Sequence, residues 1–224
     1  MAVLIDVVTL SKKLCKTPIR CELKYATDDN FVGRVIDGYD EKVTDVGFLT
    51  EKAATYLCDV QNYLYDQYNY SLLIYDAYRP HRAVIDFMRW IKQPPADQHE
   101  LDQKIKHYPH LEKSQLFEMG YLSEDSRHCY GNTVDLVLID AINGKPLDMG
   151  ACFDFMDERS HITAIAEKIG REAFQHRQVL LQAMQEFDFE PYYKEFWHFS
   201  HPLATEAKTP INIPLKPGLT KIEC

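Results

Sequence analysis

Hydrophobic and polar positions recur with different periods along the chain, and these periods predict a mixture of helices and strands. Residues 47–70 carry apolar side chains three or four positions apart, as expected for a helix with one buried face. The apolar run Ser71–Tyr75 that follows predicts a short buried strand. Pro80 biases Arg79 towards an extended backbone, so we expect the next helix to begin after it, over His81–Trp90.

The second half of the chain contains the clearest predicted strand and the longest predicted helix. Thr133–Ile139 alternates between two faces, and the dipeptide Asn143-Gly144 predicts a hairpin turn shortly after it. Residues 161–187 have a helical pattern, with Gly170 as the point where it could break. Phe196–Ser200 predicts a further short strand. The core positions expected in the long helix are Ile165, Ile169, Phe174, Leu180, Leu181 and Met184.

These elements predict an α+β fold, in which helices flank a small central antiparallel sheet. We expect residues 1–201 to form a single domain. Residues 202–224 contain four prolines and few large apolar groups, which predicts a C-terminal tail that lies extended on the surface or is partly disordered.

Composition and charge exclude several classes of function. The 224 residues are 46% hydrophobic and 26% charged, which is typical of a globular protein. The formal net charge of −9 argues against binding to nucleic acid or to an anionic membrane surface. No apolar run is long enough to span a bilayer, and the N-terminus lacks the features of an export signal. We therefore expect a cytoplasmic protein whose six cysteines are reduced.

Three separate segments carry residues suited to metal-dependent hydrolysis. His128, Asp135 and His198 would supply the three protein ligands of a catalytic zinc site, with the fourth position left to water. Glu195, three residues before His198, would then be free to take a proton from that water. Arg79, at the end of a predicted strand, is placed to stabilise an oxyanion or to hold a carboxylate.

Each segment also has an ordinary structural explanation. Asp135 is equally compatible with the solvent-exposed face of a strand. Glu195 is compatible with a surface carboxylate beside a core histidine, and Arg79 with a surface arginine paired to Asp76.

Five segments taken together, in this order, resemble one known family. Ser126–Asp135 is similar to the SxHxxGxxxD signature of zinc D,D-peptidases, Glu195–Phe199 to their ExWHF-type motif, and Asp76–Pro80 to their DxYRP segment. Lys24–Gly33 with Gly38-Tyr39, and Met149–His161, narrow the resemblance to the VanX-type D-alanyl-D-alanine dipeptidases. The resemblance extends from about residue 20 to about residue 201.

The resemblance implies a fold, a cofactor and a role for each site residue. The fold is that of the zinc D,D-peptidases and the related hedgehog domain, and the cofactor is one Zn²⁺ per chain. His128, Asp135 and His198 match the zinc ligands. Glu195 matches the general base, and Arg79 the arginine that stabilises the tetrahedral intermediate. Ser126 matches a substrate-contacting serine, whereas Asp154 and Tyr25 match groups that receive the ammonium of the dipeptide.

The implied activity is hydrolysis of free D-alanyl-D-alanine in the cytoplasm. The sequence does not fix the oligomeric state, and the chain could form a homodimer. Depletion of this dipeptide in vancomycin resistance and salvage of D-alanine from the cell wall require the same chemistry. A D,D- or L,D-carboxypeptidase or endolysin acting on peptidoglycan stem peptides is the first alternative. A non-catalytic, zinc-stabilised binding module is the second.

Overall fold

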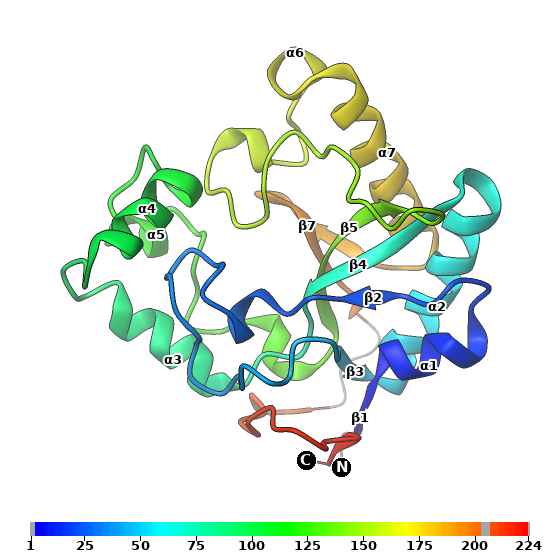
Figure 1. Ribbon diagram of the computed structural model, residues 1–224, viewed down its shortest axis with the longest axis horizontal. Coiled ribbons are helices and arrows are strands. Elements are labelled where there is room, and N and C mark those ends of the chain that lie inside the picture. The colour runs from blue at the N-terminus through cyan, green and yellow to red at the C-terminus, as the bar shows by residue number, and fades with distance from the viewer. Residues whose placement is uncertain (1–2, 203–206, 224) are drawn as a thin grey trace.

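The computed structural model describes residues 3–202 and 207–223 and has a mixed α and β architecture, as expected (Figure 1). A five-stranded sheet runs in the order β2-β4-β5-β7-β6, and a three-stranded sheet in the order β3-β1-β8. The strands are β1 (Val3–Asp6), β2 (Arg20–Cys21), β3 (Phe48–Thr50), β4 (Tyr70–Asp76), β5 (Thr133–Asp140), β6 (Glu190–Tyr192), β7 (Glu195–Ser200) and β8 (Lys221–Glu223). The α-helices are α1 (Val7–Leu14), α2 (Glu51–Tyr68), α3 (His81–Trp90), α4 (Gln98–His107), α5 (Gln115–Glu118), α6 (Ala166–Ile169) and α7 (Arg171–Glu186). Three short 3₁₀ helices are η1 (Lys24–Ala26), η2 (Arg127–Tyr130) and η3 (Glu158–Ser160).

The larger sheet is antiparallel except at one edge, where β2 runs parallel to β4. Helices α2 and α7 pack against each other, α2 against β4 and α7 against β5 and β7. All residues of β5 except Asp140 are buried. The expected strands Ser71–Tyr75, Thr133–Ile139 and Phe196–Ser200 are confirmed within one or two residues at each end.

The helix expected over residues 47–70 begins later than the apolar spacing suggested. Phe48–Thr50 is a strand that pairs with β1, and the helix starts at Glu51. Thr50 ends the strand and caps the helix, because its side chain accepts a hydrogen bond from the backbone N–H of Ala53. The prediction of His81–Trp90 after Pro80 is confirmed.

The prediction of one long helix over residues 161–187 is wrong for its first part. Gly170 has a φ of +89° and separates the single turn α6 from α7. Ile165, an expected core residue, is 52% exposed because it precedes α6 rather than lying on a buried helical face.

The turn at Asn143-Gly144 is present, but the expected hairpin is incomplete. Gly144 has a φ of +72°, and its N–H donates to the carbonyl of Asp140. The chain returns along β5 through a single bridge between Ile139 and Pro146, flanked by hydrogen bonds from the N–H of Asp140 to the carbonyl of Lys145 and from the N–H of Leu147 to the carbonyl of Leu138.

The C-terminal segment is extended, but it does not lie only on the surface. Ile211, Leu215 and Ile222 are buried in the main core, and β8 pairs with β1. Residues 207–223 are thus an extended surface segment that three buried side chains anchor to the core, whereas residues 203–206 lie outside the described part. The red C-terminal strand lies beside blue β1 in Figure 1.

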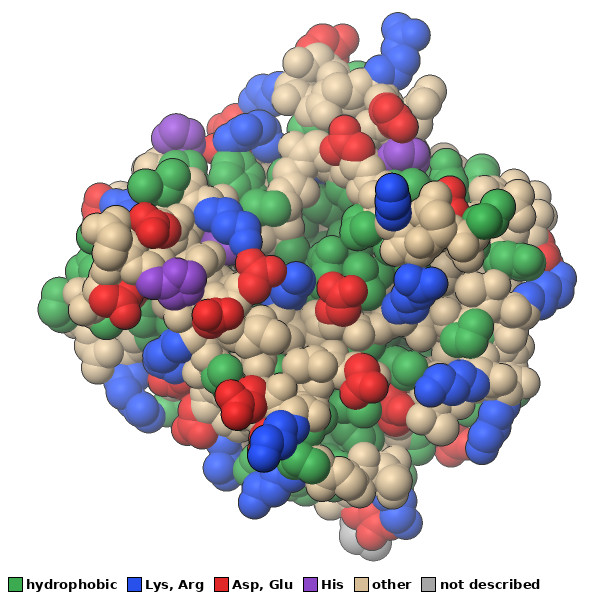
Figure 2. Space-filling model, viewed as in Figure 1, with side chains coloured by type: hydrophobic (Ala, Val, Ile, Leu, Met, Phe, Trp, Pro, Cys, Tyr) green, Lys and Arg blue, Asp and Glu red, His purple; other side chains and the backbone are tan. Residues whose placement is uncertain are grey.

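The visible face carries acidic and basic side chains interspersed, without a large patch of either sign (Figure 2). Across residues 3–202 and 207–223, no helix is both long and apolar enough to cross a membrane. The five cysteines of the described part are free thiols: Cys15, Cys21, Cys58, Cys129 and Cys152.

Candidate active site

Three neighbouring strands place Asp76, Asp135 and His198 in one row across the sheet. Asp76 of β4 pairs with Asp135 of β5, and Asp135 pairs with His198 of β7. The β4–β5 register shifts between Ile74 and Asp76, as it does in a β-bulge. The bulge puts Asp76 opposite Asp135, so that two carboxylates and an imidazole meet where the strands end.

His128 reaches this row from η2, the short turn before β5. Gly131 ends the turn at a φ of +72°, a left-handed conformation that glycine adopts without a Cβ clash. Nδ1 of His128 lies 2.7 Å from the carbonyl oxygen of Ala77, which fixes the ring and its tautomer. Nε2 is the ring nitrogen that faces Asp135 and His198.

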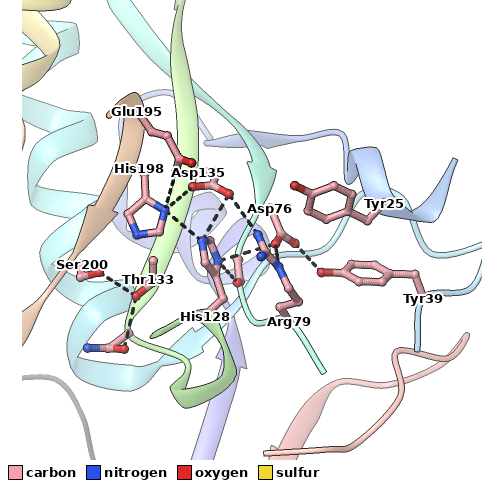
Figure 3. A network of polar contacts seen from close by, with 12 residues as sticks. Tyr25, Tyr39, Asp76, Arg79, His128, Thr133, Asp135, Glu195, His198 and Ser200 are labelled. Atoms are coloured by element: carbon pink, nitrogen blue, oxygen red, sulfur yellow. Dashed lines mark hydrogen bonds and ion pairs between the residues drawn. The ribbon is translucent and has the colours of Figure 1, made fainter. Parts of the chain in front are cut away.

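The side chains of His128, Asp135 and His198 converge, each offering one ligand atom within 4.8 Å of the others (Figure 3). Nε2 of His128 lies 3.3 Å from Oδ2 of Asp135 and 3.4 Å from Nδ1 of His198. Oδ1 of Asp135 is buried without a hydrogen-bond partner in the described part, although Nδ1 of His198 is 3.1 Å away. Converging lone pairs around an unsatisfied buried carboxylate are what a bound cation requires.

Electrostatics at this cluster favour a negative Asp135 and a positive charge beside it. Burial raises the pKa of Asp135, but the two histidines overcome this effect and hold the pKa well below its usual range. Burial lowers the pKa of His198, whereas hydrogen bonds to Asp135 and Glu195 raise it, to about 9 in total. A metal ion would supply that positive charge in place of the proton.

Glu195 lies next to the cluster because of an irregularity between β6 and β7. The register slips so that Tyr192 pairs with Glu195, and Glu195 and His198 come to the same side. Oε2 of Glu195 is 3.3 Å from Nδ1 of His198, and the Glu195 side chain is 15% exposed. Glu195 is thus beside the three converging side chains without belonging to them.

Arg79 is held on the opposite side of Asp135 by buried partners. Its Nε donates to Oδ2 of Asp76 at 2.9 Å, and Nη2 lies 3.4 Å from Oδ2 of Asp135. The hydroxyl of Tyr39 donates to the other oxygen of Asp76 at 2.7 Å. The Arg79 side chain is only 12% exposed and lies over the ring of Tyr25, so it is not a surface arginine.

A cavity of about 280 Å³ opens onto these groups. It is lined by all eight residues predicted from sequence: Tyr25, Arg79, Ser126, His128, Asp135, Asp154, Glu195 and His198. The hydroxyl of Tyr25 donates to Oδ2 of Asp154 at 2.9 Å. Burial, together with the charges of Asp135 and Glu195, raises the pKa of Asp154 well above its usual value. A cation bound there would relieve the cost of this buried carboxylate.

The sequence did not identify several residues that shape the site. The sequence offers Asp76 as a partner of a surface arginine and as part of the DxYRP segment, and Tyr39 as part of a motif, without a role in the site for either. Phe87, Tyr121 and Tyr192 also line the cavity. Asp76 could have been identified as a site residue, because a buried Arg79 requires a carboxylate partner. The aromatic residues have no comparable feature in the sequence that marks them as lining a site.

The comparisons with known proteins agree with this geometry. A family model described as D-ala-D-ala dipeptidase matches residues 12–215. A D-alanyl-D-alanine dipeptidase of Enterococcus faecalis is 39% identical over 81% of this chain and 85% of that protein. Proteins with the same name from Enterococcus faecium and Streptomyces coelicolor are 38% and 36% identical, each over 81% of this chain and 85% of their own length. Both the family model and these relatives cover most of the chain, and the chain therefore belongs to the D-alanyl-D-alanine dipeptidase family.

Proposed function

We propose that this protein hydrolyses free D-alanyl-D-alanine to two molecules of D-alanine, with one Zn²⁺ held by His128, Asp135 and His198. The observation that carries the proposal is the convergence of these three side chains in a cavity, with Glu195 directly beside them. The strand order and the helices packed against the sheet are compatible with the zinc D,D-peptidase fold.

Zinc in such a site lowers the pKa of a bound water and polarises the substrate carbonyl. Glu195 is the general base that accepts the proton of the attacking water and later donates it to the leaving amine. Arg79, fixed by Asp76, receives part of the negative charge that develops on the carbonyl oxygen. Ser126, on the cavity wall, contacts the substrate.

Recognition of a free dipeptide rests on Asp154 and Tyr25. The substrate ammonium pairs with the Asp154 carboxylate, which Tyr25 holds in place. A substrate acylated at this nitrogen would leave the buried carboxylate without its counter-ion, which is a strong basis for rejection.

A peptidase acting on longer stem peptides is the second candidate, and the cavity argues against it. Its volume of about 280 Å³ is at the small end of the range for ligand pockets. Cleavage of a tripeptide or a longer stem peptide at a rate comparable with the dipeptide would favour this alternative. The presence of both Glu195 and Arg79 at the cluster argues against a non-catalytic binding module.

The decisive experiment measures the free amino acids released from D-Ala-D-Ala, D-Ala-Gly, L-Ala-L-Ala and N-acetyl-D-Ala-D-Ala, with and without a chelator. We expect rapid hydrolysis of D-Ala-D-Ala only, abolished by the chelator and restored by zinc. Equal rates for the free and acetylated dipeptides would disprove the role of Asp154. Activity unaffected by metal removal would disprove the metal mechanism.

Glu195→Gln tests the assignment of the base with little change in shape. We expect kcat to fall by about 10²–10⁴-fold, because the amide cannot accept the proton of the water. Bound zinc, measured by elemental analysis, should stay at one per chain. His198→Ala is the contrasting variant and should lose metal and activity together. A Glu195→Gln enzyme that keeps most of its turnover would show that the base lies elsewhere.

A further inference from the structure

The backbone around Asp154 has an unusual conformation that the surrounding structure must maintain. Asp154 has a φ of +57° and is one of three non-glycine residues with positive φ in the described part. A non-glycine residue in this left-handed backbone conformation typically costs about 1–3 kcal/mol of folding free energy, and the conformation persists only where the surrounding structure fixes it. The direction in which the Asp154 carboxylate points therefore depends on what holds residues 152–156.

The C-terminal end of α4 holds this segment mainly through His107, beside a longer contact from the Cys152 thiol to the carbonyl of Lys106. Nδ1 of His107 lies 3.1 Å from the carbonyl oxygen of Phe153 and 3.3 Å from that of Asp154. The carbonyl of His107 accepts a hydrogen bond of 2.7 Å from the N–H of Met156. His107 thus contacts the chain on both sides of the Asp154 side chain, through its ring and its backbone.

The imidazole of His107 can act only as a neutral donor in this position. The ring is buried, and burial and the nearby Lys106 lower its pKa to about 4. Both oxygens near Nδ1 are carbonyl acceptors, so Nδ1 carries the proton. Nε2 is buried without a hydrogen-bond partner in residues 3–202 and 207–223. The ring therefore keeps one unsatisfied nitrogen while its other nitrogen holds two carbonyls.

We propose that His107 is a positioning residue for substrate recognition: by holding the carbonyls of Phe153 and Asp154, it aims the Asp154 carboxylate at the ammonium of the dipeptide. This inference rests on the proposed function, because it assigns the ammonium to Asp154. His107 itself is absent from the residues that line the cavity, so it acts only through Asp154.

Three substitutions separate this role from general structural support. His107→Phe keeps a buried ring but removes the donor. His107→Asn places an amide N–H where Nδ1 lies, whereas His107→Gln places it near Nε2. We expect the Phe and Gln variants to raise KM for D-Ala-D-Ala by about 10–100-fold, as loss of an outer positioning partner commonly does. The Asn variant should stay close to the wild-type KM, and kcat should change little in all three.

The diagnostic probe is N-propionyl-D-alanine, which has the shape of D-Ala-D-Ala but lacks the ammonium. Its inhibition constant should be the same in the zinc-loaded wild-type and His107→Phe enzymes, because it does not use the Asp154 charge. A parallel rise in this constant and in KM would overturn the proposal in favour of general distortion, and so would an unchanged KM. If His107→Phe does not fold, equal KM values for the Asn and Gln variants would overturn it.

The same comparison separates this inference from the proposed function. Absence of D-Ala-D-Ala hydrolysis by the wild-type enzyme would contradict the proposed function. In that case the affinities of D-Ala-D-Ala and N-propionyl-D-alanine, measured by calorimetry in wild type and His107→Phe, test the role of His107 directly. A preference for the ammonium compound that His107→Phe leaves intact would overturn that role.

Discussion

In the proposed role, Asp154 would contribute to recognition of the dipeptide ammonium at the expense of stability. Burial in the folded protein raises the pKa of this carboxyl well above its usual range. A carboxyl whose pKa is higher in the folded protein than in the unfolded chain destabilises the fold when it ionises. This loss of unfolding free energy begins as the pH rises past the pKa of the unfolded chain, and it grows until the pH reaches the pKa of the folded protein. The ionised Asp154 therefore destabilises the substrate-free protein towards neutral pH, and this destabilisation is absent in acid, where the carboxyl is protonated.

Asp154→Asn should accordingly stabilise the substrate-free protein while impairing hydrolysis of the dipeptide. The amide keeps an acceptor for Tyr25 but cannot ionise. We expect the melting temperature of the variant to exceed that of the wild type increasingly from pH 4 upwards, by about 2–4 °C for each kcal/mol relieved. Thermal unfolding from pH 3 to pH 8 measures this difference. A variant no more stable than wild type at any pH would contradict the predicted strain.

Tyr39 supports Arg79 through Asp76, and its hydroxyl can be removed without changing the ring. Tyr39→Phe leaves one oxygen of the buried Asp76 without its donor, which should cost about 1–3 kcal/mol of unfolding free energy. We also expect kcat to fall by about tenfold or more, because Arg79 is held less firmly. Tyr68→Phe, at an exposed position, is the control and should change neither quantity. Unaltered stability and kcat in Tyr39→Phe would show that the hydrogen bond is dispensable.

Residue identity in the sequence predicted the side chains that converge in the cavity, but not the partners that hold them there. His128, Asp135, His198 and Glu195 are types that bind metals or transfer protons, and their spacing matched known motifs. The partners of these groups depend on burial, and burial depends on pairing between distant strands. Asp76, for example, becomes a buried support only because the bulge in β4 places it opposite Asp135.

At the scale of secondary-structure elements, the turn η2 is fixed by a glycine that a larger residue cannot replace. A Cβ on Gly131 would overlap the side chain of Leu4, which is fully buried, and the φ of +72° would be strained as well. Gly131→Ala should destabilise the protein by about 1–3 kcal/mol and weaken zinc binding, because η2 carries His128. Gly218→Ala is a matched control, with a φ of +81° but nothing within 4 Å of the new Cβ. Equal losses of stability in the two variants would show that overlap with Leu4 contributes nothing.

The boundaries of the three predicted strands are more accurate than those of two of the three predicted helices, for a physical reason. A buried strand such as Thr133–Asp140 is a short apolar run that turn residues delimit on both sides. Apolar spacing alone cannot separate Phe48–Thr50 from the helix after it, since pairing of that strand with β1 is a long-range contact. The slip between β6 and β7, which brings Glu195 to His198, likewise has no local signal in the sequence.

At the scale of the whole molecule, the C-terminal segment connects parts of the site that are far apart in sequence. The N–H of Ile211 donates to the carbonyl of Cys129, next to His128, and its own carbonyl accepts from the N–H of His81. The hydroxyl of Tyr78 donates to the carbonyl of Ile213 and accepts from its N–H. The segment thus braces both the turn that carries His128 and the loop that carries Arg79. Its prolines suggested a surface tail because composition does not report such backbone contacts.

Tyr78→Phe tests whether this bracing matters for activity. Loss of the hydroxyl leaves the amide and carbonyl of Ile213 without this partner, which should lower the unfolding free energy by about 1–3 kcal/mol. Hydrogen exchange should become faster over residues 207–223, and kcat/KM should fall because Tyr78 precedes Arg79. Asn212→Ala, which removes exposed contacts to Arg82 from the same segment, should have a smaller effect on all three measurements. Faster exchange with unchanged kcat/KM would mean that the C-terminal segment stabilises the fold without positioning the site.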